Sequence, residues 1–159
     1  MTDELSIALN DHQQGLLDRA AERYRSILAA DPSQPDALHL LGVLAHQVGR
    51  HDRAIDLIGR AIASRVGVAV YHGNLAEAYR ASGRLDQAMA ECRIALSYQP
   101  ESPEVCNTLG LVLLARDEHE AAADRFREAL RLRPTFAMAC TNLGNALRLR
   151  GDREQALIS

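Results

Sequence analysis

Polar side chains recur at a fixed spacing in this sequence, and these are the groups that could bind a partner. Asn74, Thr108 and Asn142 stand 34 residues apart, and Leu40 occupies the preceding position of the same series. The other candidates belong to three further series with the same step: His39, Gly73, Asn107 and Thr141; Val43, Glu77, Leu111 and Asn145; His46, Arg80, Leu114 and Arg148. Because an amide offers both a donor and an acceptor, repeated amides could hold the main chain of an extended peptide.

The residues predicted to bind a partner are Asn74, Asn142, Asn145, Arg80 and Arg148, and their neighbours in the series are Thr108, Asn107, His39 and His46. The arginines would meet acidic groups of the partner. A structural role is the alternative for Asn74 and Asn142, whose amides could instead bond a neighbouring helix or turn.

Metal binding and catalysis find little support in the same residues. His39 and His46 share one helix face, but no third ligand is evident, and an exposed helix face explains both. The sequence contains no HExxH, GxSxG, P-loop or GxGxxG motif. The acidic cluster of Asp117, Glu118, Glu120 and Asp124 is expected at a solvent-facing helix start. The chain is therefore predicted to be no enzyme and to need no metal or cofactor.

The elements that would position these groups follow from an internal repeat. Gly15, Gly49 and Gly83 are 34 residues apart, Asp117 follows at the same interval, and Gly151 comes next. Two further series keep this step: Gly42, Ala76, Gly110 and Gly144; Ala20, Ala54, Ala88, Ala122 and Ala156. Such regularity is the signature of a repeat architecture, in which each unit must stack on its neighbours to bury a core.

Within one unit the pattern predicts two helices joined by a turn. Apolar residues recur at helical spacing on both sides of Gly49, and a glycine there can adopt the left-handed conformation that ends a helix. Pro32, Pro100 and Pro134 would end second helices, while Pro35 and Pro103 fit the first turn of the next helix. Ser33 and Ser102 stand where helix N-caps are expected. Val66 replaces a proline, so the junction around it is expected to be irregular.

This arrangement resembles the tetratricopeptide repeat family over the whole chain. The segments that carry the resemblance are "LLGVLAHQVGRHDRAIDLIGRAI", "NLAEAYRASGRLDQAMAECRIAL" and "TLGLVLLARDEHEAAADRFREAL". The resemblance implies an all-α, right-handed superhelical solenoid with repeats at 1–34, 35–68, 69–102 and 103–136 and a partial repeat at 137–159. It also implies a concave groove, lined by the first helices, that binds a protein or peptide.

Two narrower resemblances suggest partners. The stretches "YHGNLAEAYRASGRLDQA" and "CTNLGNALRLRGDREQA" are similar to repeats in front of O-linked N-acetylglucosamine transferases, whose asparagine ladder holds substrate backbones. The chain would then be the recognition part of a larger glycosyltransferase-like protein. The alternative is an adaptor that clamps a C-terminal carboxylate of a chaperone. No lysine is present for such a clamp, but Arg80 and Arg148 could replace it.

Composition limits the remaining classes. A net charge of −3 argues against nucleic-acid binding, and no apolar run could span a membrane, so a cytoplasmic location is expected. Cys92, Cys106 and Cys140 lie in apolar patterns and are expected to be buried, reduced thiols. The last repeat is cut after Gly151, which would leave Leu143, Leu147, Ala156 and Leu157 without a covering helix. This predicts self-association through that end or a frayed terminus.

Overall fold

The computed structural model describes the backbone of residues 3–158 and the side chains of residues 3–151, and this part is entirely helical, without strands. Its helices are α1 (Asp3–Gln13), α2 (Leu17–Ala30), α3 (Pro35–Gln47), α4 (His51–Ser64), α5 (Ala69–Ala81), α6 (Leu85–Tyr98), α7 (Pro103–Ala115), α8 (His119–Leu132) and α9 (Ala137–Ile158). None of the helices in this part is long and apolar enough to cross a bilayer.

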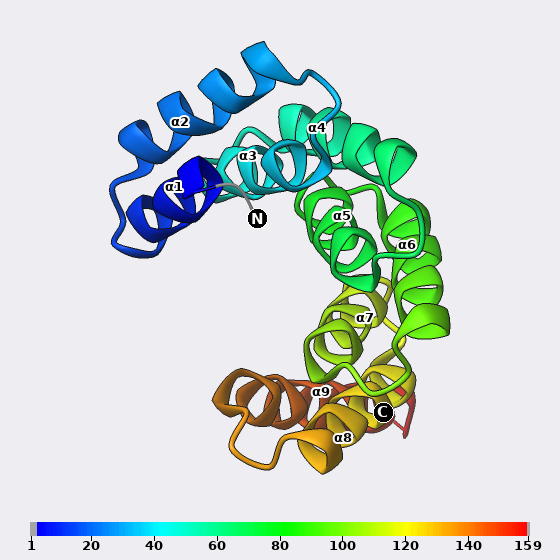
Figure 1. Cartoon of the computed structure of the whole chain (residues 1–159). Coiled ribbons are helices and arrows are strands. Elements are labelled where there is room, and N and C mark those ends of the chain that lie inside the picture. Colours follow the sequence, from blue (N-terminus) through cyan, green and yellow to red (C-terminus); the bar gives the residue numbers. More distant parts are fainter. Residues whose placement is uncertain (1–2, 159) are drawn as a thin grey trace.

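The helices form antiparallel pairs that stack into a curve (Figure 1). The first helices α1, α3, α5 and α7 lie on the inner side of the curve, and the second helices α2, α4 and α6 lie on the outer side. Successive first helices contact one another, whereas within the described part no two second helices do. Because successive first helices lie closer to one another than successive second helices do, the stack curves with the first helices on its inner side, as expected for an all-α solenoid.

Small residues let the two helices of each pair approach closely. Ala20, Ala54, Ala88 and Ala122 are fully buried, one in each second helix. Opposite them lie Gly42 and Gly110, where an added Cβ atom would come within 2.6 Å of Ile58 and 2.5 Å of Phe126. The close approach therefore depends on glycine, and the large buried side chains of the second helices fill the space that it leaves.

The turns inside the first four pairs confirm the expected left-handed residue. Gly15, Gly49 and Gly83 each have a φ angle of 77°, and Asp117 has a φ angle of 62°. Glycine adopts this conformation without a steric penalty, but aspartate does not. Asp117 is therefore the one strained turn residue among these four.

Replacing Asp117 by glycine should raise the free energy of unfolding by about 0.5–1 kcal/mol, because the left-handed conformation then becomes unstrained. Urea denaturation measures the change. The reciprocal variant Gly83→Asp, at the matched turn, should lose a similar amount. Equal stabilities of the wild type and both variants would show that the turn conformation contributes nothing.

The helix ends agree with the prolines and N-caps expected from the sequence, with one exception. α2, α6 and α8 each end two residues before a proline, and Ser102 caps α7 by accepting a hydrogen bond from the backbone N–H of Val105. α3 is capped by Gln34 and not by Ser33, because the Gln34 side chain is long enough to reach the Ala37 N–H, while Ser33 donates to Asp31. The junction between α4 and α5 is irregular, with Gly67 at a φ angle of 80°.

The C-terminal helix corrects an expectation. A turn was expected at Gly151, but α9 continues through it to Ile158. In the other pairs the chain turns because a second helix of 14 residues then packs onto the first. The continued helix satisfies the backbone groups around Gly151. Leu143 and Leu147 are half-buried against the core, while Ala156 and Leu157 lie outside the described side chains.

The cysteines differ in burial. Cys92 and Cys106 are buried free thiols, as expected, and burial raises the pKa of Cys92 to about 12. Cys140, in the first turn of α9, is exposed, contrary to expectation.

Candidate functional site

The asparagines of the repeating series bond side chains of the preceding first helix. Asn74 Nδ2 donates to His39 Nε2 at 2.7 Å, and Asn142 Nδ2 donates to Asn107 Oδ1 at 2.9 Å. In both pairs the partners are 35 residues apart. Candidates that the sequence placed in two separate series are therefore joined across neighbouring helices, which is the structural role considered for these amides.

The first of these hydrogen bonds leaves Asn74 Oδ1 unused, and the second leaves Asn107 Nδ2 and Asn142 Oδ1 unused. Within the described residues, Asn74 Oδ1 and Asn107 Nδ2 have no hydrogen-bond partner. One is an acceptor and the other is a donor, and they come from the neighbouring helices α5 and α7. This is the complement that the N–H and C=O groups of a peptide main chain require.

His39 is buried, contrary to the expected exposed helix face. Only 8% of it is exposed, and its ring lies against Tyr71 with centroids 4.4 Å apart. Burial lowers the pKa of His39 to about 4, although the nearby Asp36 carboxylate acts in the opposite direction. At neutral pH the ring is uncharged, so Nε2 can accept the Asn74 hydrogen bond.

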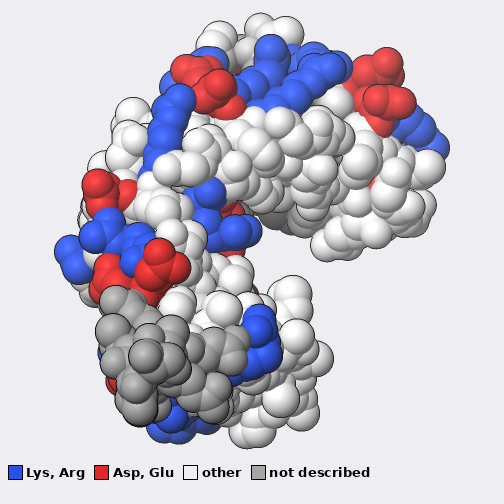
Figure 2. All heavy atoms as spheres, turned by 180° about the vertical axis from the view of Figure 1, so that it is seen from behind, with Lys and Arg blue, Asp and Glu red and all other residues white. Residues whose placement is uncertain are grey.

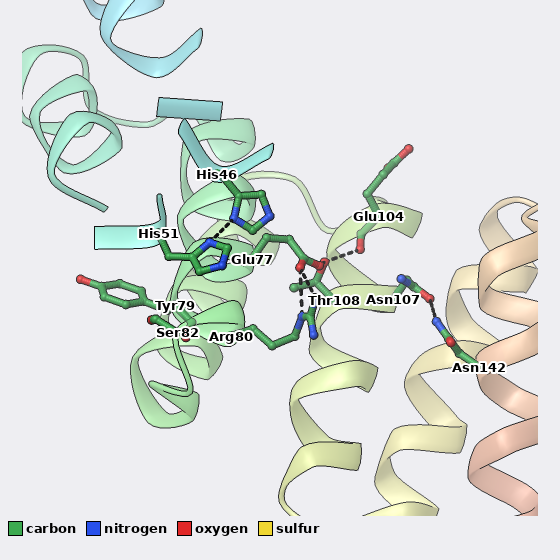
Figure 3. A network of polar contacts seen from close by, with 10 residues as sticks. All are labelled: His46, His51, Glu77, Tyr79, Arg80, Ser82, Glu104, Asn107, Thr108 and Asn142. Atoms are coloured by element: carbon green, nitrogen blue, oxygen red, sulfur yellow. Dashed lines mark hydrogen bonds and ion pairs between the residues drawn. The ribbon is translucent and has the colours of Figure 1, made fainter. Parts of the chain in front are cut away.

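Glu77 connects two of the candidates (Figure 3). Arg80 Nε donates to Glu77 Oε2 at 2.9 Å, and Thr108 Oγ1 donates to Glu77 Oε1 at 2.6 Å. Glu77 was not among the residues predicted to bind, although an acid three residues before an arginine on one helix face is a recognisable signal. Arg80 is thus already paired with a carboxylate of the protein itself.

The other candidates lie apart from this cluster. His46 Nδ1 is 3.2 Å from His51 Nδ1, and the pKa of His46 is lowered by burial and then by the neighbouring His51. Asn145 Oδ1 accepts a hydrogen bond from Arg148 Nη2 at 3.1 Å on the exposed side of α9. Within the described residues, no three side chains are grouped so that they could hold a metal ion.

A cavity of about 410 Å³ opens between the N-terminal halves of α5 and α7. No residue of α4 or α8 lines it, so it belongs to the inner, first-helix side of the curve. Its apolar lining is formed by Ala69, Val70, Val105, Phe136 and Met138, and its polar lining includes Asn74, Glu77, Ser102, Glu104, Asn107 and Thr108. The cavity thus combines an apolar wall with the amide atoms described above.

Of the residues predicted to bind, the cavity gathers Asn74, Asn107 and Thr108. The remaining six are outside its lining: His39, His46, Arg80, Asn142, Asn145 and Arg148. Its apolar residues were not candidates in the sequence, because an isolated Val70 or Met138 shows no sign of function until the fold places them together.

Charged side chains gather mainly along the outer rim of the curve (Figure 2). Arg127 donates to Asp124 at 2.7 Å, and Arg131 pairs with Glu128 at 2.8 Å. Asp117, Glu118, Glu120 and Asp124 are all exposed. The acidic and basic residues of this region therefore form a solvated face, as expected, with each such ion pair contributing little.

A curved stack of helix pairs, with first helices exposed along its inner side, defines an α-helical repeat solenoid, a class of protein-interaction scaffold. The tetratricopeptide repeat model matches residues 6–67, 47–104 and 107–159. The chain belongs to the tetratricopeptide repeat family.

The relatives agree with this assignment. Protein FlbA of Caulobacter vibrioides is 28% identical over 151 residues, which is 95% of this chain and 25% of FlbA. The structure of the Cut9–Hcn1 hetero-tetramer of the APC/C is similar with a TM-score of 0.86 and 25% identity over 91% of this chain and 29% of that one. PilF of Pseudomonas aeruginosa is similar with a TM-score of 0.83 and 25% identity over 95% of this chain and 68% of PilF. The chain spans a quarter of the length of the curated relatives it matches.

Proposed function

We propose that the inner surface binds an extended segment of a partner protein, with Asn74 and Asn107 holding its main chain. The observation that carries this proposal is the pair of amide atoms without partners, one acceptor and one donor, beside the cavity between α5 and α7. His39 and Asn142 then act as positioning residues, because each bonds one of these amides and fixes its orientation. Thr108 positions Glu77 in the same way.

Asn145 and Arg148 extend the proposed surface along α9, where both are exposed. Arg148 would meet an acidic group of the partner there. Arg80 is less suited to this role than the sequence suggested, because an incoming carboxylate would have to compete with Glu77.

A clamp for a C-terminal carboxylate is the second candidate, and the cavity argues against placing it there. The charged residues of the described lining are Glu77 and Glu104, with no arginine among them. Two carboxylates would repel a third. A clamp elsewhere on the chain would bind a peptide with a free C-terminus more tightly than its amidated form.

The wider context remains a proposal based on resemblance alone. The repeats are similar to those in front of O-linked N-acetylglucosamine transferases, so we place this chain in the recognition part of a larger protein of that type. Sequencing the source gene on either side of this region tests the idea, and a gene without a transferase domain would remove it.

Peptide binding can be tested with a random peptide library displayed on phage. The tightest peptide selected on the wild-type chain should bind the double variant Asn74→Ala, Asn107→Ala about tenfold or more weakly, because each lost hydrogen bond contributes about 1 kcal/mol. Isothermal titration calorimetry measures the affinity.

The matched control is Gln87→Ala, which removes an exposed amide from α6 on the outer side. It should leave the affinity unchanged. Unchanged affinity of the double variant, together with a lower melting temperature, would show that the two asparagines serve only the stack. A library from which no peptide is selected would contradict the proposed function itself.

A further inference from the structure

One ion pair recurs in two helix pairs of this chain, α3–α4 and α7–α8, and the pair α5–α6 between them lacks it. Asp36, the second residue of α3, is 2.9 Å from Arg65, which follows α4. Glu104, the second residue of α7, pairs in the same way with Arg133 after α8. In the pair α5–α6 the corresponding positions hold Val70 and Gln99. An apolar and a neutral residue thus replace a bridge that its neighbours form.

The two positions that lack the ion pair lie at the cavity described above. Val70 and Gln99 both line it, and Val70 is 53% exposed. On the opposite side, Met138 is 63% exposed. Large apolar side chains held at a cavity mouth in this way are typical of binding surfaces.

Gly73 adds to the opening between α5 and α7. A Cβ atom there would lie 3.1 Å from Val105 Cγ2, so any larger residue would press into the cavity wall. The resulting volume of about 410 Å³ falls within the roughly 300–1,000 Å³ of ligand pockets in general.

The charge of the cavity restricts what can enter. Its lining holds the carboxylates of Glu77 and Glu104, while their partners Arg80 and Arg133 are outside the lining. An acidic group would face these carboxylate oxygens at the mouth, whereas a basic group could share them with Arg80 and Arg133.

We propose that this cavity accepts one bulky apolar side chain, flanked by basic residues, from a partner polypeptide. The inference rests on the proposed function, because the segment that carries this side chain is the one whose main chain Asn74 and Asn107 hold. It adds the sequence preference that amide contacts to a main chain cannot supply.

Fluorescently labelled peptides test the preference directly. Ser-Gly-Arg-Phe-Arg-Gly-Ser with blocked ends should bind at least tenfold more tightly than versions with Ala for Phe or Glu for both Arg, as measured by fluorescence anisotropy. In methyl-labelled protein the Met138 signal should shift on binding, whereas Met89, which lies outside the lining, should not. Equal affinities of the three peptides, or no binding of the first, would overturn the inference.

The double variant Val70→Asp, Gln99→Arg supplies the missing ion pair and should close the mouth. Both side chains are exposed, and two neighbouring helix pairs already contain such a bridge, so the fold should be retained. We expect at least tenfold weaker binding of the Phe peptide. Val66→Asp is the matched control, because Val66 is 78% exposed and lies outside the cavity.

Two results separate the inference from the proposed function. If a library-selected peptide still depends on Asn74 and Asn107 but ignores the Val70→Asp, Gln99→Arg change, the cavity is not its side-chain site and the inference is wrong. If neither change affects any selected peptide, both proposals fail together.

Discussion

Lowering the pH from 7 to about 4 is expected to reduce the free energy of unfolding by about 3 kcal/mol through His39 alone. Burial lowers the pKa of His39 from 6.5 to about 4 in the folded protein. Between these two values the unfolded chain binds a proton that the folded chain does not. Stability from this residue is therefore complete above pH 6.5, falls as the pH decreases, and changes no further below about pH 4.

Protonation also disrupts a specific contact. A protonated His39 has a donor at Nε2, which then faces the donor Nδ2 of Asn74 at 2.7 Å. The hydrogen bond between α3 and α5 then requires the Asn74 amide to turn over and present Oδ1, and a charge is left in an apolar environment against Tyr71.

The variant His39→Gln isolates this effect from the titration of the carboxylates. Its side-chain oxygen can accept from Asn74 but does not titrate. Urea denaturation of both proteins at pH 7 and pH 4 should give a loss about 3 kcal/mol larger for the wild type. Equal losses of unfolding free energy in the two proteins would show that the pKa of His39 is not lowered in the folded protein.

Gly110→Ala is expected to lower the free energy of unfolding by about 1–2 kcal/mol. The new Cβ would lie 2.5 Å from Phe126 Cε1, and Phe126 is fully buried, so its ring has no free space to enter. Overpacking of this kind costs about 1–3 kcal/mol, while alanine gains up to about 1 kcal/mol in helix propensity.

Gly59→Ala is the matched control, because it also lies in a helix interior but has nothing within 4 Å of the added atom. It should be neutral or stabilising. The second change Phe126→Leu should cost less in the Gly110→Ala background than alone, because a smaller side chain relieves the clash. Additive losses in this double-mutant cycle would show that the two residues do not collide.

The helices could be predicted from the sequence because the information for them is local and repeated. Each turn depends on one residue that tolerates a left-handed backbone, and Asp117 could be placed by the spacing even though it is not a glycine. The prediction was wrong at Gly151, where α9 continues. A glycine permits a turn but does not require one.

The candidate site could be predicted only in part. Asn74, Asn107 and Thr108 were recognised from the spacing, and all three line the cavity. Comparing residues 34 apart, however, hid the hydrogen bonds between residues 35 apart, because neighbouring first helices are offset by one position where these side chains meet. The 34-residue spacing already shows that Val70 and Gln99 replace a charged pair. It does not show that both residues line a cavity.

By itself the sequence determined the family, the all-α solenoid and the face on which its polar series lie. These follow from periodic small and large residues, since units with one shared pattern bury those residues by stacking on their neighbours. The tertiary structure alone decided which side chains form hydrogen bonds with each other and which amide atoms take no part in these bonds. It also brought Val70 of α5 to one cavity with Phe136 and Met138 from the start of α9. Such proximity depends on the angle and offset between packed helices, which no single stretch of residues encodes.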